Sequence, residues 1–165
     1  MKKCLISLIY ILTINNLFSL SFTPCSQLVK LKNDIGGVRT LPNEVIENFG
    51  NNYESFESDV YGVIPNTSEG DIIITYDYSG LKYLFFSSNT YDKFFLYYWE
   101  IEDNDFIEEY NINFGMSYSD ILDKFGEGFM NKPQLIGYYF DDGGLFFEFR
   151  NKSLVTIYWS FSDDM

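Results

Sequence analysis

Apolar residues recur with the spacing of a short amphipathic helix in two separate parts of the chain. The two stripes are Val45, Ile46 and Phe49, and Ile121, Leu122 and Phe125. Each set occupies positions i, i+1 and i+4, which lie on one face of a helix. A glycine, the residue that most often ends a helix, follows each stripe directly. The pattern therefore predicts two short helices that end at Gly50 and Gly126.

The residues before the two stripes are typical of helix starts. Pro42 suits the first helical position, because its missing N–H would have no partner inside the helix. Ser117 is a favourable N-cap, and Asp120 stands three residues later, as in a capping box. We therefore expect one helix over residues 42–48 and a second that begins after Ser117.

Six stretches rich in aromatic and β-branched residues read as strands. They cover about 71–78, 81–87 and 94–101, and then about 136–140, 145–150 and 154–161. The segments between them, Ser79-Gly80, Asp141–Gly144 and Asn151-Lys152, have the composition of hairpin turns. Residues 51–70 are rich in Asn, Ser, Glu and Gly, so we expect a loop there.

The order of one helix followed by three strands occurs twice. Subtraction of positions gives offsets of 76 residues at Phe49-Gly50 and Phe125-Gly126, 64 at Gly80 and Gly144, and 60 at Trp99 and Trp159. We expect an α+β fold of two repeats, each a short helical segment followed by an antiparallel β-meander. The repeats would join into one curved sheet with helices on one face. The expected division is a signal peptide at 1–21, a lead-in at 22–33, repeat 1 at 34–101, an acidic linker at 102–111 and repeat 2 at 112–165.

Alternation along the strands separates a face that packs on the helices from an open face. The predicted core positions include Val155, Ile157, Trp159 and Phe161, and by the repeat Phe95, Tyr97, Trp99 and Ile101. The opposite positions give a candidate partner-binding set: Tyr98, Glu100, Tyr139, Phe146, Glu148, Arg150 and Tyr158, beside Lys82, Leu84 and Phe86. Aromatic residues mixed with a few charges have the composition of interface centres. The alternative is that Tyr and Phe fill a strand surface because they favour strands.

The N-terminus has the pattern of a secretory signal peptide. Lys2 and Lys3 precede an apolar run, and Ser19 and Ser21 place small residues before a cleavage site after Ser21. A polar pair, Asn15-Asn16, interrupts the run before it reaches the length that a membrane span needs. We therefore expect an exported protein that is periplasmic, envelope-associated or secreted.

Cys25 raises a second possibility for the exported chain. Cleavage directly before this cysteine would allow a lipid anchor, although Pro24 is a poor residue for the position that precedes a lipidated cysteine. Cleavage after Ser21 would leave Cys25 as the single thiol, so the mature chain would have no intrachain disulfide.

Charge and composition narrow the range of partners. Residues 1–21 hold two of the 11 basic residues and none of the 24 acidic ones, so their removal leaves a net charge of −15. Such a chain repels phosphate backbones and anionic lipid headgroups, so we expect no nucleic-acid partner and no binding to a membrane surface apart from the lipid anchor. A protein partner of unknown identity stays open. Aromatic residues make up 20% of the chain, enough to build a large core.

The chain contains no histidine, which excludes the common catalytic triads and the commonest zinc ligand. We expect no cofactor and no metal, because the alternating Asp103 and Asp105 lack the rest of a calcium loop. Asp141 and Asp142 could in principle serve glycoside hydrolysis, but the preference of Asp for turns already explains them.

Several of these residues resemble the repeat of β-lactamase-inhibitor-protein-like domains and of the related SmpA/OmlA outer-membrane assembly lipoproteins. They are Gly115-Met116-Ser117, Asp120-Ile121-Leu122 and Phe125-Gly126. The resemblance implies a short helix followed by antiparallel strands in each of two tandem copies. It also implies that the paired sheets form one concave surface that grips a partner protein.

The leading functional hypothesis is an exported, non-catalytic protein that recognises a protein partner with the open face of its sheet. One alternative is an envelope-structural lipoprotein anchored through Cys25. The other is a carboxylate-dependent enzyme that uses the acidic turn at Asp141 and Asp142.

Overall fold

The fold is α+β and was obtained as a computed structural model that describes residues 25–37, 39–61, 67–88 and 93–161. Within these residues it contains three α-helices, two short 3-10 helices and one open, eight-stranded antiparallel sheet. The helices are α2 (Ser26–Ile35), α3 (Pro42–Phe49) and α4 (Tyr118–Phe125). The expected signal peptide and its cleavage site lie outside the described residues.

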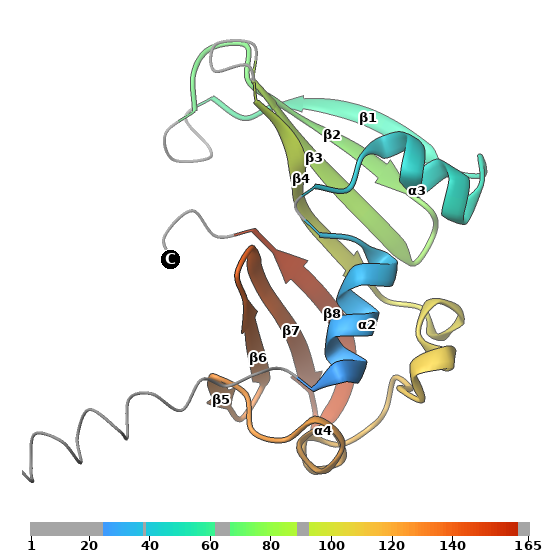
Figure 1. Cartoon of the computed structure of the whole chain (residues 1–165), viewed down its shortest axis with the longest axis vertical. Coiled ribbons are helices and arrows are strands. Elements are labelled where there is room, and N and C mark those ends of the chain that lie inside the picture. Colours follow the sequence, from blue (N-terminus) through green and yellow to red (C-terminus); the bar gives the residue numbers. More distant parts are fainter. Residues whose placement is uncertain (1–24, 38, 62–66, 89–92, 162–165) are drawn as a thin grey trace, which may run out of the picture.

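The sheet has the strand order β1-β2-β3-β4-β8-β7-β6-β5 (Figure 1). The six strands predicted from the sequence are confirmed as β2 (Ile72–Asp77), β3 (Leu81–Ser88), β4 (Lys93–Ile101), β6 (Leu135–Phe140), β7 (Gly143–Arg150) and β8 (Ser153–Ser160). Strands β4 and β8 join the two halves through four residue pairs, from Tyr98 opposite Ser160 to Ile101 opposite Ile157. β8, the last described strand in the sequence, therefore lies in the middle of the sheet and not at its edge.

The two edge strands were not predicted. β1 (Glu54–Asp59) lies within the segment expected to be a loop, and β5 (Met130–Lys132) is only three residues long. All six residues of β1 are exposed, so the strand has no buried apolar alternation that a sequence pattern could reveal. Its acidic composition protects an open sheet edge against unwanted strand pairing.

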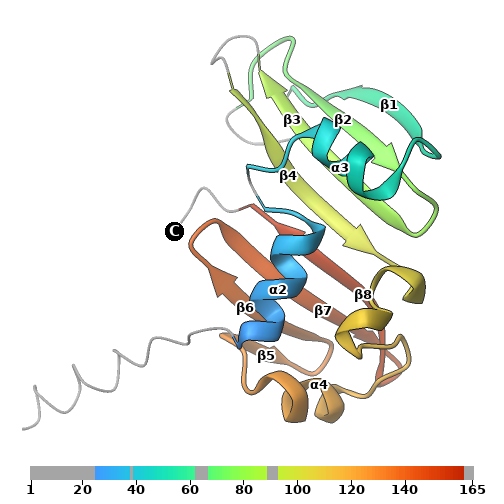
Figure 2. The same ribbon diagram turned by 45° about the vertical axis from the view of Figure 1, so that its right-hand side comes forward.

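All three helices lie on the same face of the sheet (Figures 1 and 2). Their buried residues share one core with the strands: Leu28, Leu31 and Ile35 from α2, Val45 from α3, and Ile121 and Phe125 from α4. The helix predicted after Ser117 is confirmed, and its capping box is formed. Asp120 N donates to Ser117 Oγ at 3.2 Å, and Ser117 N donates to Asp120 Oδ2 at 2.7 Å.

Helix α2 covers most of the segment predicted as a lead-in and extends into the predicted repeat 1. Its apolar residues at i, i+3 and i+7 form a stripe that the sequence analysis did not use. Two side chains of the sheet cap its C-terminal end: Tyr83 Oη donates to Ile35 O at 2.7 Å, and Trp99 Nε1 donates to Gly36 O at 2.8 Å.

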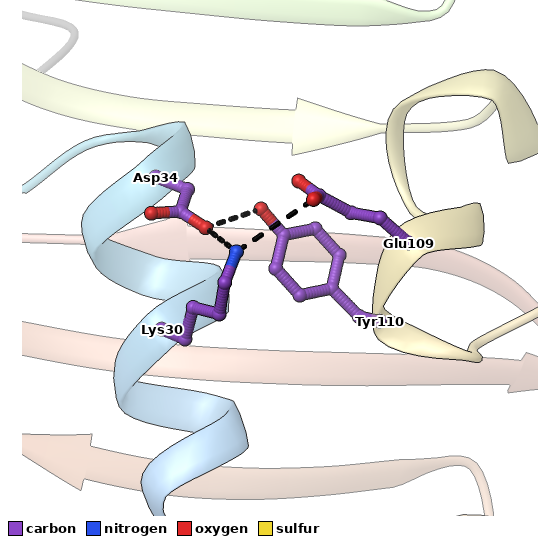
Figure 3. A network of polar contacts seen from close by, with 4 residues as sticks. All are labelled: Lys30, Asp34, Glu109 and Tyr110. Atoms are coloured by element: carbon purple, nitrogen blue, oxygen red, sulfur yellow. Dashed lines mark hydrogen bonds and ion pairs between the residues drawn. The ribbon is translucent and has the colours of Figure 1, made fainter.

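The acidic segment between β4 and α4 is fixed to helix α2. It forms two 3-10 turns, η1 (Asn104–Phe106) and η2 (Glu108–Tyr110), and Ile107 between them is fully buried. Figure 3 shows the polar network that joins η2 to α2. Tyr110 Oη donates to Asp34 Oδ2 at 2.9 Å, and Lys30 forms ion pairs with both Asp34 and Glu109.

A β-bulge in β4 overturns part of the predicted core. Leu84 pairs with Tyr98 whereas Phe85 pairs with Leu96, so Tyr97 is an extra residue in β4. An extra residue shifts the alternation by one position. Phe95 and Tyr97 therefore do not join the main core as predicted, and the fully buried residue at this point is Leu96. Phe95 and Tyr97 instead contact a second small cluster of Val60, Ile73 and Phe86 on the open face.

The same kind of irregularity occurs in β8. Glu148 pairs with Thr156 and Phe149 with Leu154, so Val155 is the extra residue. The prediction that Val155 is core and Leu154 is open is wrong, because Leu154 is 1% exposed and belongs to the main core. Beyond both bulges the predicted alternation holds: Trp99, Ile101, Ile157 and Trp159 are fully buried.

Candidate functional site: the open face of the sheet

The seven predicted site residues lie on the face of the sheet opposite the helices, which we call the open face. Their core-side neighbours along the strands, among them Trp99, Leu145, Phe147 and Trp159, are fully buried. The register places Lys82, Glu100, Tyr158 and Phe146 opposite one another in one row across β3, β4, β8 and β7. An adjacent row runs from Leu84 through Tyr98, Ser160 and Gly144 to Tyr139.

Five aromatic side chains form a continuous line across the open face, which we call the aromatic row: Tyr98, Tyr158, Phe146, Tyr139 and Phe129. The centroids of successive rings are 5.7, 5.0, 6.2 and 4.6 Å apart. The rings of Phe146 and Tyr158 are stacked at 20°, whereas those of Phe146 and Tyr139 are perpendicular. The row therefore crosses β4, β8, β7 and β6 and ends in the loop before β5.

Two glycines make room for the ring of Phe146. A Cβ atom at Gly144 would lie 2.5 Å from Phe146 Cε2, and one at Gly137 would lie 2.9 Å from Phe146 Cδ1. Neither glycine has a positive φ, so close approach of the ring and not backbone conformation requires them. The ring thus covers the backbone of both positions, which fixes the middle of the aromatic row.

One end of the row carries a hydrogen-bonded charge cluster. Glu100 accepts a hydrogen bond from Lys82 Nζ at 2.7 Å through Oε1 and another from Tyr98 Oη at 2.8 Å through Oε2. The bond to Glu100 raises the pKa of Lys82, and burial followed by the bond to Glu100 raises the pKa of Tyr98. Burial also raises the pKa of Tyr158. Both phenols therefore remain neutral hydrogen-bond donors at physiological pH.

The other two charged residues predicted for the site, Glu148 and Arg150, lie farther from the aromatic row. Arg150 Nε contacts Glu148 Oε1 at 3.3 Å, and their side chains are 70% and 36% exposed. An exposed pair of this kind adds little to stability, typically about 0–1 kcal/mol. By register Lys132 shares the row of Glu148. By register the strands of the open face carry Lys82, Lys93, Lys132 and Arg150 against Glu54, Asp77, Glu100 and Glu148, so this face is close to neutral in a strongly acidic chain.

Two exposed aromatic residues of the open face were missed by the sequence analysis. Phe129 is 65% exposed, the highest value among the large apolar side chains described, and Phe56 on β1 is 52% exposed. Phe56 joins the face because it pairs with Thr75, which in turn pairs with Leu84. The sequence offers only weak signals for them: Phe56 is a single apolar residue in a polar segment, and Phe129 follows a glycine-rich stretch.

The geometry of the rings limits what the aromatic row can bind. Sugars and nucleobases stack on free aromatic faces. Here the faces of Tyr158 and Phe146 are stacked against each other, and Tyr98 packs beside Tyr158. The two ring faces that meet in the Tyr158–Phe146 stack are therefore not available to a planar ligand.

The other candidate residues lie away from this face. Asp142, on the turn between β6 and β7, is held by Lys32 Nζ of α2 at 2.7 Å. The thiol of Cys25 is free and half-buried, and it packs against the main core. Across the described ranges, no cluster of three or more His, Cys, Asp or Glu residues could hold a metal ion. Nor does any helix in that part of the chain have the length and apolarity to cross a membrane.

Comparisons with protein-family models, with curated proteins and with solved structures give no significant match to this chain.

Proposed function

We propose that this chain is an exported, non-catalytic binding protein that recognises a protein partner through the open face of its sheet. The observation that carries the proposal is the aromatic row, with five rings in contact from Tyr98 to Phe129. Clustered Tyr and Phe side chains, bordered by hydrogen-bonded charges, are the usual energetic centre of a protein interface. The helices cover only the other face, so this surface is free to meet a partner.

The near neutrality of the open face indicates the kind of contact. Long-range attraction of a basic partner would need a concentrated negative surface. The acidic groups of the open face are instead matched by basic ones, as in the pairs Lys82–Glu100 and Arg150–Glu148. We therefore expect affinity to come from apolar contacts and short hydrogen bonds, with a weak dependence on salt.

We further propose that the face is built from two copies of one unit. The same contacts occur in both halves: Gly50 and Gly126 end α3 and α4 with φ values of 83° and 81°. A tyrosine hydroxyl donates to the carbonyl of each of these glycines, from Tyr78 at 3.3 Å and from Tyr138 at 2.8 Å. The two tyrosines are 60 residues apart, the same offset as Trp99 and Trp159, and the shared contact supports the resemblance to β-lactamase-inhibitor-protein-like domains.

The lipoprotein alternative receives less support from the surroundings of Cys25. This residue is the N-cap of α2, with its side chain packed on the core, so the helix begins directly at the residue that would carry the lipid. The enzyme alternative is also weaker, because the carboxylate of Asp142 is already neutralised by Lys32.

Site-specific photocrosslinking tests the partner proposal. A photoreactive phenylalanine at position 129 on the open face should capture a discrete partner from the native cell envelope. The same group at position 41 should not, because Leu41 is similarly exposed at 44% but lies at the start of α3 on the helix side. Equal capture at both positions, or none at position 129, would contradict the assignment of the open face.

A further inference from the structure

A second candidate site lies on the helix side of the sheet. A cleft of about 720 Å³ opens where the end of α2, the residues that lead into α3 and the turn between β6 and β7 meet. Its polar lining comes from three separate parts of the sequence: Lys32 and Asn33, Arg39 and Glu44, and Asp141 and Asp142. A cleft of this size is within the range of small-molecule sites.

The floor of the cleft is a fixed ion pair. Lys32 Nζ lies 2.7 Å from Asp142 Oδ2, and the two side chains are only 13% and 23% exposed. The ammonium group also lies 5.6 Å from the centre of the Phe140 ring. Gly37 packs closely on this pair, since a Cβ atom there would lie 3.0 Å from Asp142 Oδ2 and 3.1 Å from Lys32 Cε. The ion pair is therefore packed against both Phe140 and Gly37.

Two further charged groups of the cleft are unpaired. Among the described residues, neither Arg39 nor Asp141 makes an ion pair or a hydrogen bond through its side chain, and they do not pair with each other. Arg39 is presented by a closed turn, in which Thr40 N donates to Gly37 O at 2.8 Å and Gly37 N donates to Thr40 Oγ1 at 2.9 Å. The cleft thus offers one unpaired cationic side chain, Arg39, and one unpaired anionic side chain, Asp141.

A third polar group also lacks a partner. The Oδ1 atom of Asp142 is buried and accepts no hydrogen bond within the described part of the chain. A buried acceptor that has lost water without gaining a donor is costly, by about 1–3 kcal/mol. A ligand N–H group that reached this atom would relieve the cost.

We propose that this cleft binds a small zwitterion, namely an amino acid or a short peptide with free termini. Its carboxylate would contact the guanidinium of Arg39, which suits a planar carboxylate through two parallel hydrogen bonds. Its ammonium would contact the carboxylate of Asp141, next to Asp142. A purely anionic ligand would leave Asp141 unpaired, and a purely cationic one would leave Arg39 unpaired, because Lys32 and Asp142 already neutralise each other.

The site does not depend on the proposed function of the open face, because it lies on the other side of the sheet. Titration of the isotope-labelled protein with alanine, dialanine and trialanine, followed by amide NMR shifts, tests it directly. We expect at least one of these probes to shift the amides of Gly37 and Gly143 while that of Phe146 stays unchanged. Acetylation of the amino terminus or amidation of the carboxyl terminus should weaken binding about tenfold or more.

Matched variants identify the groups that bind the probe. Arg39→Gln and Asp141→Asn should each reduce the affinity about tenfold. Lys152→Gln and Asp123→Asn remove a positive and a negative charge from exposed positions outside the cleft and should leave the affinity unchanged. The proposal is overturned if none of the three probes shifts the amides of the cleft at about 10 mM. It is equally overturned if capped probes bind as well as free ones, or if the cleft variants match the controls.

Discussion

Trp99 and Trp159 lie directly opposite each other in the central strand pair β4–β8, and both side chains are fully buried. The two indole N–H groups differ in their hydrogen bonding. Trp99 Nε1 donates to Gly36 O at 2.8 Å, whereas Trp159 Nε1 is buried and has no acceptor among the described residues. Helix α2 thus supplies a hydrogen-bond partner to one tryptophan of the pair only, which makes the two halves of the sheet energetically different.

This asymmetry predicts different outcomes for the two Trp→Phe variants. Trp99→Phe should destabilise the protein by about 1 kcal/mol more than Trp159→Phe, because only the former leaves a carbonyl, that of Gly36, without its donor. The Trp→Ala variants should both cost about 3–5 kcal/mol, since each removes a large buried ring. Urea unfolding followed by circular dichroism measures all four values. Equal costs for the two Phe variants would contradict a role for the bond to Gly36.

The contact between Gly144 and Phe146 can be tested by a double-mutant cycle. Gly144→Ala should destabilise the fold by about 1–3 kcal/mol, because the new methyl group would overlap the ring of Phe146. The same change in a Phe146→Ala background should cost much less, since the obstructing ring is gone. If Gly144→Ala costs the same in both backgrounds, the ring of Phe146 does not lie over this glycine.

Much of the fold could be predicted because the hydrophobic pattern was regular. The stripe of Ile121, Leu122 and Phe125 and the turns at Gly80 and Asn151 located a helix and two hairpins correctly. The bulges at Tyr97 and Val155 could not be predicted, because one extra residue changes the face of the flanking positions without changing composition. Strand β1 was missed for a different reason: it is defined only by backbone pairing with β2 and buries none of its side chains.

For the candidate site, alternation along the strands was enough to place Tyr98, Tyr158 and Phe146 on one face of the sheet. Tyr98, Tyr158 and Phe146 are neighbours in the structure because the register of β4, β8 and β7 aligns them. Phe129 could not be added from the sequence, since a loop has no periodicity that relates it to the ring of Tyr139. The cleft at Arg39 could not be predicted from the sequence either, because segments that are distant in the sequence form it.

Tyrosine ionisation should limit stability at alkaline pH. Burial raises the pKa values of Tyr83, Tyr98 and Tyr158 above the usual value of 10.0. Because the folded state favours the neutral phenol, the stability gained from these groups is complete below pH 10 and is lost as the pH rises further. We expect phenolate absorbance from these residues to appear together with unfolding. Tyr98→Phe should move the alkaline midpoint upward; full ionisation near pH 10 in the folded protein would contradict the buried placement.

The N-terminus of the mature chain distinguishes the hypothesis of a secreted protein from that of a lipoprotein. Mass spectrometry and N-terminal sequencing of mature material should give a chain that begins near Phe22, as the small residues before it predict. A chain that begins at Cys25 and carries a fatty acid, with the label lost in Cys25→Ser, would support the lipoprotein. A chain that retains Met1 in the cytosol would contradict export.

The Phe129→Ala variant best distinguishes an effect on partner binding from an effect on folding. Its side chain is 65% exposed, and among the other described rings of the aromatic row it contacts Tyr139 alone. Phe129→Ala should therefore change the free energy of unfolding by less than about 0.5 kcal/mol. Tyr98→Ala should cost more, because it also removes the hydrogen bond to Glu100.

If the open face binds a partner, Phe129→Ala should nevertheless weaken binding to the partner captured at this position, by about 1 kcal/mol or more, as expected for an aromatic anchor. Leu41→Ala is the matched control, since it removes a comparably exposed apolar side chain from the helix side. Surface plasmon resonance at two salt concentrations measures both variants, and the loss at Phe129 should change little with salt. An unchanged affinity in Phe129→Ala, together with a loss in Leu41→Ala, would place the interface on the helices and not on the open face.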